Sequence, residues 1–403
     1  MLNIPGIFLG KKFTPLNLIT ISRQRLIDNY HNLSAINPAI KIAPVLKSNA
    51  YGHGIKLVGE ILDKVGAPFL CVDSLYEAFQ LKSKAKVKTP LLIMGYIHPK
   101  SLSIKKLPFS FAVYDLDHAR ALNDYQKGAK VHIFVDTGMN REGVPMDELE
   151  DFLMAMKQLG NVTIEGIMSH LADSANPKSE LTKMQVDNFG NAKKAVFESG
   201  FKPRWFHLGG TYGLLNELTA GCNLIRVGRA VYGISDVGQG SRAKGQDSGH
   251  LPLNLKPVLK HTSKIVQIKK IKKGEKVGYS GTFVASKDMT IGVLPLGYND
   301  GVDRRLSNKG VVGVESFDKL RTRSDEGGEG KKLIFCPIIG LVSMNVTTID
   351  LSGLKEPVLG SEAVIFSDDP QDPNSVVNTS KAGGVLPHEM LIHIAESTKR
   401  VVV

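Results

Sequence analysis

Lys47 stands at the end of an apolar run, in the stretch KIAPVLKSNAYGHG that covers residues 41–54. Small and polar residues follow this lysine, with Tyr51 and His53 among them. An ammonium group is costly to bury, so a lysine that ends a strand usually marks a solvated edge. A lysine whose pKa falls from about 10.4, through burial beside other cations, acts instead as a nucleophile or base.

Polar side chains also follow other short apolar runs. Asp136 and Arg141 come after residues 131–135, and Ser169 and His170 come after residues 164–168. Taken alone, His170 reads as a core histidine and Arg141 as a surface charge. A guanidinium is nevertheless the group that best matches the fork of a carboxylate, so Arg141 is a candidate for binding a substrate carboxylate.

The last two apolar runs lead into glycine-rich loops. His207 precedes the loop that holds Gly209, Gly210 and Thr211, and Arg226 precedes VGRAVYG. These glycines alone could simply form turns. The common position of all these polar residues at the ends of apolar runs favours one converging functional site.

Eight short apolar runs alternate with helical patterns over the first 230 residues, which favours a parallel sheet covered by helices. About eight strands in this length indicate an α/β fold, a closed TIM-like (β/α)8 barrel with its active site at the C-terminal ends of the strands. An open doubly wound sheet is the alternative, weakened because no Gly-x-Gly-x-x-Gly follows the first strand. The expected strands cover residues 42–46, 69–72, 91–94, 110–113, 131–135, 164–168, 206–208 and 223–226. Helical patterns begin at Ser74, Asp117 and Asp147, and the two aspartates are expected N-caps.

The character of the sequence changes after Ile234. Residues 235–250 are polar and rich in glycine, and strand-like patterns separated by turn signals follow from Pro257. We therefore expect a barrel domain over residues 14–250 and a mainly β C-terminal domain over residues 251–403. A charged, glycine-rich segment at about 315–332 is expected to be a surface insertion.

Composition limits the classes of function. The chain has 403 residues, with 51 lysines and arginines against 39 acidic residues and a formal net charge of +12. The excess charge is dispersed and lacks zinc-finger spacing or an aromatic-rich basic stripe, so we expect anionic ligands, no metal and no nucleic acid. The three cysteines are far apart and fit a reducing compartment. No stretch reaches the roughly 20 apolar residues of a membrane helix, and a cytoplasmic location without a membrane partner is expected.

The two glycine-rich loops follow the last two strands, where barrels usually bind phosphate through backbone N–H groups. Thr211 would add a hydroxyl donor. With a nucleophilic lysine and a nearby cation, the loops point to a cofactor that has a phosphate, an electrophile and a charged ring. Pyridoxal 5'-phosphate (PLP) fits, because its aldehyde forms a Schiff base with lysine and its ring nitrogen needs a tuning partner.

Seven motifs extend over both expected domains: VLKSNAYGHG, VDTGMNREG, SHLADS, IRVGRAVYGI, GYSGTF, LPLGYNDGVDRRL and GLVSMN. In this order they resemble the alanine racemase family. The resemblance implies a PLP-binding barrel followed by a β domain, and a head-to-tail homodimer with active sites shared between subunits. It also implies interconversion of L- and D-alanine through a PLP aldimine, which supplies D-alanine for cell-wall peptidoglycan.

The resemblance assigns two acid/base groups on opposite faces of the substrate. Lys47 is similar to the family's Schiff-base lysine, which is also one acid/base group, and Tyr279 to the opposing group, supplied by the partner subunit. His170 and Arg226 are similar to the hydrogen-bonded pair behind that tyrosine, and Arg226 to the residue that faces the pyridine nitrogen. Read without the resemblance, Tyr279 is a strand tyrosine of a β core.

The remaining assignments concern the phosphate and the substrate. Phosphate contacts correspond to Tyr51, Thr211, Gly228, the backbone of Arg229, and His388. Substrate contacts correspond to Arg141, the backbone N–H of Met344, and Tyr298 at the entrance, contributed by the other subunit.

Three positions depart from the family pattern. Phe134 stands where the family often has a lysine that holds the substrate arginine, a role that Asn140 or a bound anion would have to fill. Asn345 replaces an aspartate at the entrance, and His388 replaces a tyrosine in the usual Tyr-Glu pair. That tyrosine touches the phosphate and crowds the substrate methyl group. A histidine there leaves open a broader specificity that includes serine.

Two further classes remain as alternatives. A PLP-dependent decarboxylase of the related fold would share the lysine, the phosphate loops and the dimer, but it would usually carry a cysteine in place of the Tyr279 arrangement. A non-enzymatic PLP-binding protein would typically lack the second domain. RNA binding rests on the net charge alone.

Overall fold

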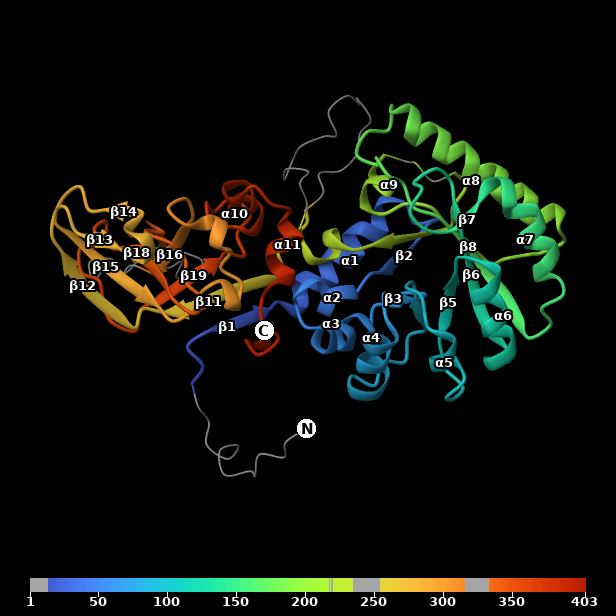
Figure 1. Cartoon of the computed structure of the whole chain (residues 1–403), viewed down its shortest axis with the longest axis horizontal. Coiled ribbons are helices and arrows are strands. Elements are labelled where there is room, and N and C mark those ends of the chain that lie inside the picture. Colours follow the sequence, from blue (N-terminus) through green and yellow to red (C-terminus); the bar gives the residue numbers. More distant parts are fainter. Residues whose placement is uncertain (1–13, 217, 219, 235–253, 316–332) are drawn as a thin grey trace. The chain divides into compact units, whose positions relative to one another are not determined.

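The computed structural model describes residues 14–216, 218, 220–234, 254–315 and 333–403 (Figure 1). The chain divides into two compact units. One unit is Ser22–Val258, and the other combines the described residues up to Ile21 with Leu259–Val403. The expected connector over residues 235–250, and the expected insertion beyond Glu315, lie outside the described residues.

Ser22–Val258 folds as a (β/α)8 barrel, as the sequence predicted. All eight expected strands are present, with bounds that differ from the expected ones by no more than two residues. A short additional strand, β7 (Val144–Pro145), pairs with β6. The eight barrel strands are β2 (Lys41–Pro44), β3 (Leu70–Val72), β4 (Leu91–Ile93), β5 (Ser110–Val113), β6 (Ala129–Asp136), β8 (Val162–Met168), β9 (Trp205–His207) and β10 (Leu224–Val227).

The strands close into a ring. Parallel pairing runs in the order β3-β4-β5-β6-β8-β9, and β10 pairs separately with β2. Val45, just after β2, bridges Cys71 of β3 in parallel. At the other junction, Asn223 N donates to Phe206 O (3.2 Å) where β10 begins beside β9. Because both junctions are bonded, the open doubly wound alternative is wrong.

Helices cover the outside of the barrel strands (Figure 1). Ser74, where a helical pattern was expected to begin, caps α4 in a reciprocal capping box with Glu77. The two expected caps, Asp117 and Asp147, are wrong: Asp115 caps α6, and Asp147 lies in a short 3-10 turn before α7. The helices are α1 (Arg23–Ile36), α2 (Lys47–Tyr51), α3 (Ile55–Leu62), α4 (Leu75–Phe79), α5 (Pro99–Leu102), α6 (Leu116–Tyr125), α7 (Leu149–Met156), α8 (Glu180–Glu198) and α9 (Thr211–Leu215), with short turns η1 (Gln80–Lys84), η2 (Met146–Glu148) and η3 (Arg229–Tyr232).

Side chains of different sizes fill the barrel interior. Small residues such as Ala43 and Cys71 lie in one buried cluster with Phe69 and Trp205, whose rings meet edge to face at 5.7 Å between centroids. Large and small side chains from neighbouring strands interdigitate in this way in closed barrels. The barrel is therefore a packed core, and the functional groups lie at its ends.

The C-terminal unit consists mainly of β-strands. Its largest sheet has the order β17-β16-β19-β11-β1-β20, and a smaller one has the order β12-β15-β18. The strands are β1 (Leu18–Ile21), β11 (Leu259–Lys264), β12 (Gln267–Ile271), β13 (Lys276–Val277), β14 (Phe283–Val284), β15 (Met289–Leu294), β16 (Val311–Glu315), β17 (Leu333–Pro337), β18 (Thr347–Asp350), β19 (Glu362–Phe366) and β20 (Lys399–Val402), with helices α10 (Val376–Gly383) and α11 (Pro387–Ile392) and turns η4 (Tyr279–Gly281), η5 (Tyr298–Asp300) and η6 (Arg304–Leu306).

The first strand departs from the expected domain range of 14–250. β1 pairs antiparallel with β11 and parallel with β20, so it completes the large sheet of the C-terminal unit. Its partners lie more than two hundred residues further along the chain, beyond the reach of a local sequence pattern. Among the described helices, none is long and apolar enough to span a membrane.

Asn29 fixes α1 to the end of the barrel chain. Its buried amide donates from Nδ2 to Val231 O (3.0 Å) and Lys256 O (2.9 Å), and its Oδ1 accepts from Lys256 N (2.9 Å). On the next turn of the same helix, the exposed Asn32 donates from Nδ2 to Asn254 O (3.0 Å). These two asparagines form a matched pair for measuring the stability that α1 gains from this junction.

Replacing Asn29 with alanine should lower the free energy of unfolding by about 2–4 kcal/mol, because three backbone groups lose their partners at a buried position. The Asn32→Ala change removes one exposed hydrogen bond and should cost less than about 1 kcal/mol. Chemical denaturation of both variants measures the difference. Equal losses would contradict the role given to Asn29.

Candidate active site

A cavity of about 620 Å³ lies at the C-terminal ends of the barrel strands. Its volume is in the usual range for small-molecule sites. The structure brings together at this cavity every barrel residue that the sequence singled out by resemblance. These residues are Lys47, Tyr51, Arg141, His170, Thr211, Arg226, Gly228 and Arg229.

Lys47 opens an unusual left-handed turn. Directly after it, Ser48, Asn49, Ala50 and Tyr51 all have φ between 52° and 54°, a region that residues with a Cβ rarely adopt. Asn49 Oδ1 accepts from Ile55 N (2.8 Å), which bonds the turn to the start of α3. The turn orients Lys47 toward the mouth of the barrel and Tyr51 back toward the same cavity.

Glu77 holds this turn against the next strand, a role that the sequence did not reveal. One carboxylate oxygen, Oε1, accepts from Ser48 N (2.6 Å), and the other, Oε2, accepts from Asp73 N (2.9 Å) and Ser74 N (3.3 Å). Charge-assisted bonds to backbone N–H groups are stronger than neutral ones. Glu77 therefore joins the Lys47 turn to the end of β3.

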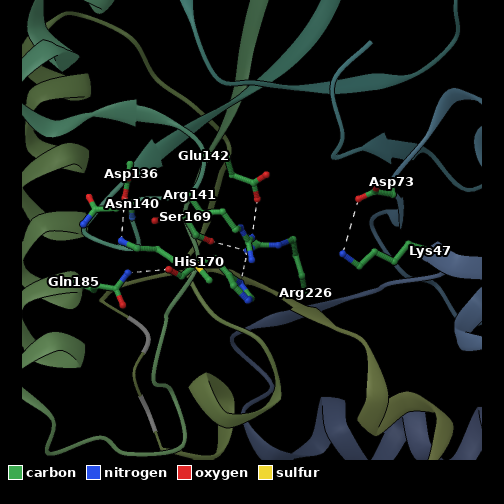
Figure 2. Close-up of polar contacts among 11 residues, drawn as sticks. Lys47, Asp73, Asp136, Asn140, Arg141, Glu142, Ser169, His170, Gln185 and Arg226 are labelled. Atoms are coloured by element: carbon green, nitrogen blue, oxygen red, sulfur yellow. Dashed lines mark hydrogen bonds and ion pairs between the residues drawn. The ribbon is translucent and has the colours of Figure 1, made fainter. Parts of the chain in front are cut away.

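Asp73 is the carboxylate nearest to the lysine amine, as Figure 2 shows. Lys47 Nζ lies 3.8 Å from Asp73 Oδ1, with 41% and 57% of the two side chains exposed. An exposed pair at this distance contributes little stability. The amine is therefore not fixed by this contact.

Arg226, at the end of β10, is buried and donates to four acceptors, of which Figure 2 shows those on Ser169 and His170. Its NH1 group donates to His207 Nδ1 (2.7 Å) and His207 O (3.0 Å), and NH2 donates to Ser169 O (2.6 Å) and His170 Nδ1 (3.4 Å). A guanidinium has five N–H donors. The fifth, on Nε, has no acceptor among the residues that the structure describes.

A chain of buried polar groups continues from Arg226 down the barrel interior. His207 Nε2 lies 2.7 Å from His132 Nδ1, and His132 Nε2 lies 3.4 Å from Glu165 Oε2. Because arginine can only donate, His207 Nδ1 must accept, and the neutral ring then donates from Nε2 to His132. Burial lowers the pKa of both histidines, and the charge of Arg226 adds to this. The chain therefore has a cation at the upper end, two neutral imidazoles, and a carboxylate at the lower end.

Gly166 provides the space that this chain needs. A Cβ at position 166 would come within 2.3 Å of His132 Nδ1. The sequence did not identify His132 or Glu165, although a histidine on an otherwise apolar strand such as KVHIFV was a possible signal. The histidine lies completely buried inside the barrel.

His170 remains neutral beside the cations of the site. Burial is the main cause that lowers its pKa to about 3, followed by the positive charges of Arg226, Arg141 and Lys47. Its Nδ1 accepts from Arg226, so the neutral ring carries its proton on Nε2. His170 is thus a neutral donor at the cavity, oriented by a permanent cation.

The two glycine-rich loops form one side of the cavity. Gly210 precedes α9 and Gly228 precedes η3, so backbone N–H groups at the start of two helical turns border the cavity. A Cβ at Gly228 would come within 2.4 Å of Tyr51 Oη. Only glycine leaves room for the phenol at this loop. Phosphate oxygens are the ligands that such N–H groups bind best.

Arg141 differs in environment from the other cations. It lies in the loop after β6, 53% exposed, and donates from NH2 to Glu142 Oε1 (2.7 Å), as Figure 2 shows. Phe134, at the departure position, is buried against Ala112 and Met168. The charged partner of Arg141 is therefore the adjacent Glu142, which the sequence did not reveal.

The loop that carries Arg141 is ordered by a carboxylate. Asp136 Oδ1 accepts from the backbone N–H groups of Gly138 (2.9 Å), Met139 (2.9 Å) and Asn140 (3.1 Å). Asn140 itself is exposed and has φ 54°. Asn140 thus shapes the turn before Arg141, and among the described residues their side chains are not joined by a hydrogen bond.

The other predicted site residues belong to the C-terminal unit. Tyr298 N donates to Ser343 O (3.0 Å) and Asn299 N donates to Met344 O (3.0 Å), so the loops that carry Tyr298 and Met344 lie side by side. Asn345 Nδ2 is 3.4 Å from Asp300 Oδ2 in the same pair of loops. The structure therefore brings these two predicted substrate residues together.

Tyr279 and His388 occupy contrasting positions in that unit. Tyr279 begins a 3-10 turn after Gly278, which has φ 73°, and its side chain is 69% exposed. Met344 is 56% exposed. His388 is partly buried on α11. In the part of the chain that the structure describes, no group of three His, Cys, Asp or Glu residues is arranged to hold a metal ion.

The low pKa of His170 has a measurable effect on stability. The unfolded chain takes up this proton near pH 6.5 and the folded chain only near pH 3, so acidification between these values favours unfolding. One histidine contributes about 1.4 kcal/mol per pH unit in this window. Between about pH 6 and about pH 4, the free energy of unfolding of the His170→Gln variant should fall by about 1.4 kcal/mol less per pH unit than that of the wild type. Denaturation at both pH values measures it, and an unchanged slope would refute the buried neutral state.

Profiles of known protein families match nearly the whole chain. The profile described as "Alanine racemase, N-terminal domain" matches residues 21–236, and "Alanine racemase, C-terminal domain" matches residues 258–402. The alanine racemase of Citrifermentans bemidjiense is 31% identical over 387 residues, covering 92% of this chain and 94% of that protein.

Solved structures are similar over a comparable length. Alanine racemase from Oenococcus oeni has a TM-score of 0.77 at 26% identity, covering 96% of this chain and 98% of that one. Alanine racemase from Bartonella henselae with covalently bound pyridoxal phosphate has a TM-score of 0.76 at 22% identity, covering 97% and 100%. With both family profiles matched in order and a relative similar over almost its full length, the chain belongs to the alanine racemase family.

Proposed function

We propose that this chain interconverts L- and D-alanine with pyridoxal phosphate, using Lys47 and Tyr279 as its two acid/base groups. The observation that carries this proposal is the convergence of Lys47, the buried Arg226 and two glycine loops on one cavity. Supply of D-alanine for peptidoglycan follows from membership of the alanine racemase family. A cytoplasmic location fits this role.

The residues of the barrel mouth fit the cofactor. Lys47 would bind its aldehyde, and Tyr51, Thr211, Gly228 and the backbone of Arg229, with His388, would hold its phosphate. The close approach of Tyr51 to Gly228, where a Cβ would not fit, supports this arrangement. When bound, pyridoxal phosphate withdraws electrons from the substrate Cα and makes its proton acidic.

Two acid/base groups on opposite faces explain how configuration is inverted. Lys47 Nζ takes the proton from one face of Cα, and the Tyr279 hydroxyl returns one to the other face. In the reverse direction the two groups exchange roles. His170, neutral and oriented by Arg226, donates toward the tyrosine and holds it in place.

Arg226 would set the protonation state of the cofactor's ring nitrogen. Its Nε–H, the donor without an acceptor among the described residues, would face the ring nitrogen. Because arginine keeps its proton, it leaves that nitrogen unprotonated. By leaving that nitrogen unprotonated, Arg226 would limit the negative charge that the ring can accept and would suppress side reactions such as transamination.

Arg141 and the backbone N–H of Met344 would bind the substrate carboxylate, with Tyr298 at the entrance. Glu142 already accepts from Arg141 (2.7 Å). The substrate carboxylate would therefore share or replace this bond. In this chain Glu142 orients the guanidinium that a lysine at position 134 would otherwise hold.

The active site is completed by a second copy of the chain. Tyr279 and Met344 are exposed large side chains on one unit, 69% and 56% respectively, although both are assigned to a site that excludes water. Large apolar side chains exposed together are typical of an interface. We infer a head-to-tail homodimer in which Tyr279, Tyr298 and Met344 come from the partner subunit.

His388 bears on substrate choice. It replaces a tyrosine that crowds the substrate methyl group, so serine is the second candidate substrate. Rates of racemisation of L-alanine and L-serine, followed on a chiral column, distinguish the two. A decarboxylase would instead release carbon dioxide from basic amino acids, and a cofactor-binding protein would turn over neither.

Mixing two inactive variants tests the shared site. Lys47→Ala and Tyr279→Phe should each lower alanine racemisation by about 100-fold or more, because each removes one acid/base group. When the two variants are co-expressed, half of the randomly formed dimers are mixed and hold one intact site. The mixture should therefore recover about a quarter of the wild-type activity.

The controls separate chemistry from folding. Each variant co-expressed with itself must stay inactive, and Tyr279→Phe must keep the cofactor absorbance of the wild type. If Tyr279→Phe alone turns over at the wild-type rate, the two-base mechanism is wrong. If both variants are inactive and the mixture recovers nothing, the site lies within one chain.

Replacing Arg226 with glutamate tests the control of the ring nitrogen. A carboxylate there can share a proton with that nitrogen, so transamination products should rise relative to racemisation. Mass spectrometry of pyruvate and pyridoxamine phosphate measures this ratio. Arg226→Lys, which keeps a cation, serves as the control. An unchanged product ratio in the glutamate variant would eliminate this role for Arg226.

A further inference from the structure

A second cavity, of about 470 Å³, lies at the opposite end of the barrel. Its walls come from the N-terminal ends of the strands: Leu91 starts β4, Ser110 starts β5, Trp205 starts β9, and Lys130 is the second residue of β6. The C-terminal ends of these strands face the active-site cavity. We refer to this cavity at the N-terminal end as the basic mouth.

The basic mouth has a strong excess of positive charge. Six cationic side chains line it against a single carboxylate, that of Glu165. The cations are Lys82, Lys88, Lys106, Lys127, Lys130 and Arg204.

The single carboxylate is already engaged. Glu165 accepts from Lys130 Nζ (2.9 Å) and from Ser110 Oγ (2.9 Å), and His132 lies 3.4 Å away on its inner side. By contrast, Lys106 and Lys127 are exposed, and neither Nζ has a hydrogen-bond or carboxylate partner among the described residues. Glu165 therefore offsets Lys130, whereas Lys106 and Lys127 have no counter-charge among the described residues.

Buried side chains hold the cationic loops in place. Gln126 is 2% exposed; its Oε1 accepts from Leu107 N (2.8 Å) and its Nε2 donates to Lys105 O (2.9 Å). The side-chain amide of Gln126 fixes the backbone on both sides of Lys106. Gln126 also directly precedes Lys127 in the sequence. The two unbalanced lysines are therefore presented by one fixed pair of loops.

The same construction recurs around the mouth. Asp63 Oδ1 accepts from Lys88 N (2.8 Å) and Thr89 N (2.7 Å), which fixes the loop that carries Lys88. Asn223 Nδ2 donates to Arg204 O (2.8 Å) at the start of β9. A fixed backbone reduces the entropy that a ligand must overcome to order these charges.

A row of lysines on a helix is normally a solvated surface. Lys88, Lys106, Lys127, Lys130 and Arg204 lie instead on loops and strand ends far apart in the sequence, and the barrel gathers them around one concavity. Like charges repel, and a concave low-dielectric wall strengthens the field that they create. An anion in the mouth would relieve that repulsion.

We propose that the basic mouth binds a small polyanion that carries a chain of phosphate groups, either free or as part of a nucleotide. The cavity volume suits a small molecule. Several cations spaced around the mouth suit a chain of phosphates, where a single phosphate would use only part of them. The site is separate from the phosphate loops at Gly210 and Gly228, which lie at the other end of the barrel strands.

Isothermal titration of the protein loaded with pyridoxal phosphate tests the proposal, because the active-site phosphate loops are then occupied. Tripolyphosphate and ATP, without magnesium, are titrated separately at about 0.15 M salt, where long-range attraction is largely screened. We expect one polyanion per chain. Tighter binding of ATP would identify a nucleotide ligand, and equal binding would identify the phosphate chain as the recognised group.

Two double variants locate the site. Lys106→Gln with Lys127→Gln should weaken binding by roughly tenfold or more, because two charge-assisted contacts are lost. The control, Lys157→Gln with Lys194→Gln, removes the same charge from an exposed residue after α7 and one on α8. It should leave the affinity within about twofold. Failure of both polyanions to bind, or equal weakening in both double variants, would overturn the proposal.

Discussion

A guanidinium that cannot lose its proton lies buried at the end of β10, so its neighbours must accept hydrogen bonds from it. Ser169 and His207 supply backbone carbonyls, and His207 and His170 supply ring nitrogens. This requirement sets the tautomers of both histidines. It also explains why polar residues end β8, β9 and β10 together: each of these strand ends contributes an acceptor or the cation itself.

The part of the cavity proposed to bind the substrate is organised by carboxylates of the chain. Asp136 folds the loop after β6, and Glu142 binds the guanidinium that this loop presents. Because Phe134 is packed in the barrel core, β6 supplies no cation that could orient Arg141. Orientation of Arg141 therefore depends on an exposed ion pair. An exposed pair contributes little stability, so it gives way readily to a competing carboxylate.

Local pattern was sufficient for the barrel strands and for the residues at their C-terminal ends. Continuous apolar runs and the polar residue that follows each one are visible within a few positions. Pairing between distant segments is not visible in a local pattern. For this reason the residues of β1 were assigned to the barrel domain, although β1 joins the sheet of the C-terminal unit. Asp117 was expected as a cap, whereas Asp115, two residues earlier, caps the helix; the position of a cap depends on where the chain leaves β5.

Most of the residues that sequence reasoning missed act through a neighbour far along the chain; Glu142, which pairs with the adjacent Arg141, is the exception. Glu77 fixes the backbone at Ser48, and His132 touches His207. No spacing rule links these pairs. By contrast, Lys47 and Arg226 were found because each ends an apolar run, and the family motifs around them supplied the roles of Tyr279 and Met344.

The left-handed turn after Lys47 links the stability of this protein to the position of the Lys47 amine. Four consecutive residues with a Cβ in that conformation raise the energy of the folded chain by about 4–8 kcal/mol. Packing elsewhere in the barrel must offset this, so the lysine proposed to bind the cofactor stands on an unfavourable segment of the backbone. Glycine at Ser48 or Ala50 would relieve the turn, and a screen for heat resistance would favour such changes. The same changes would loosen the one segment whose rigidity aims the amine. Selection for robustness and selection for catalysis therefore act in opposite directions at this turn.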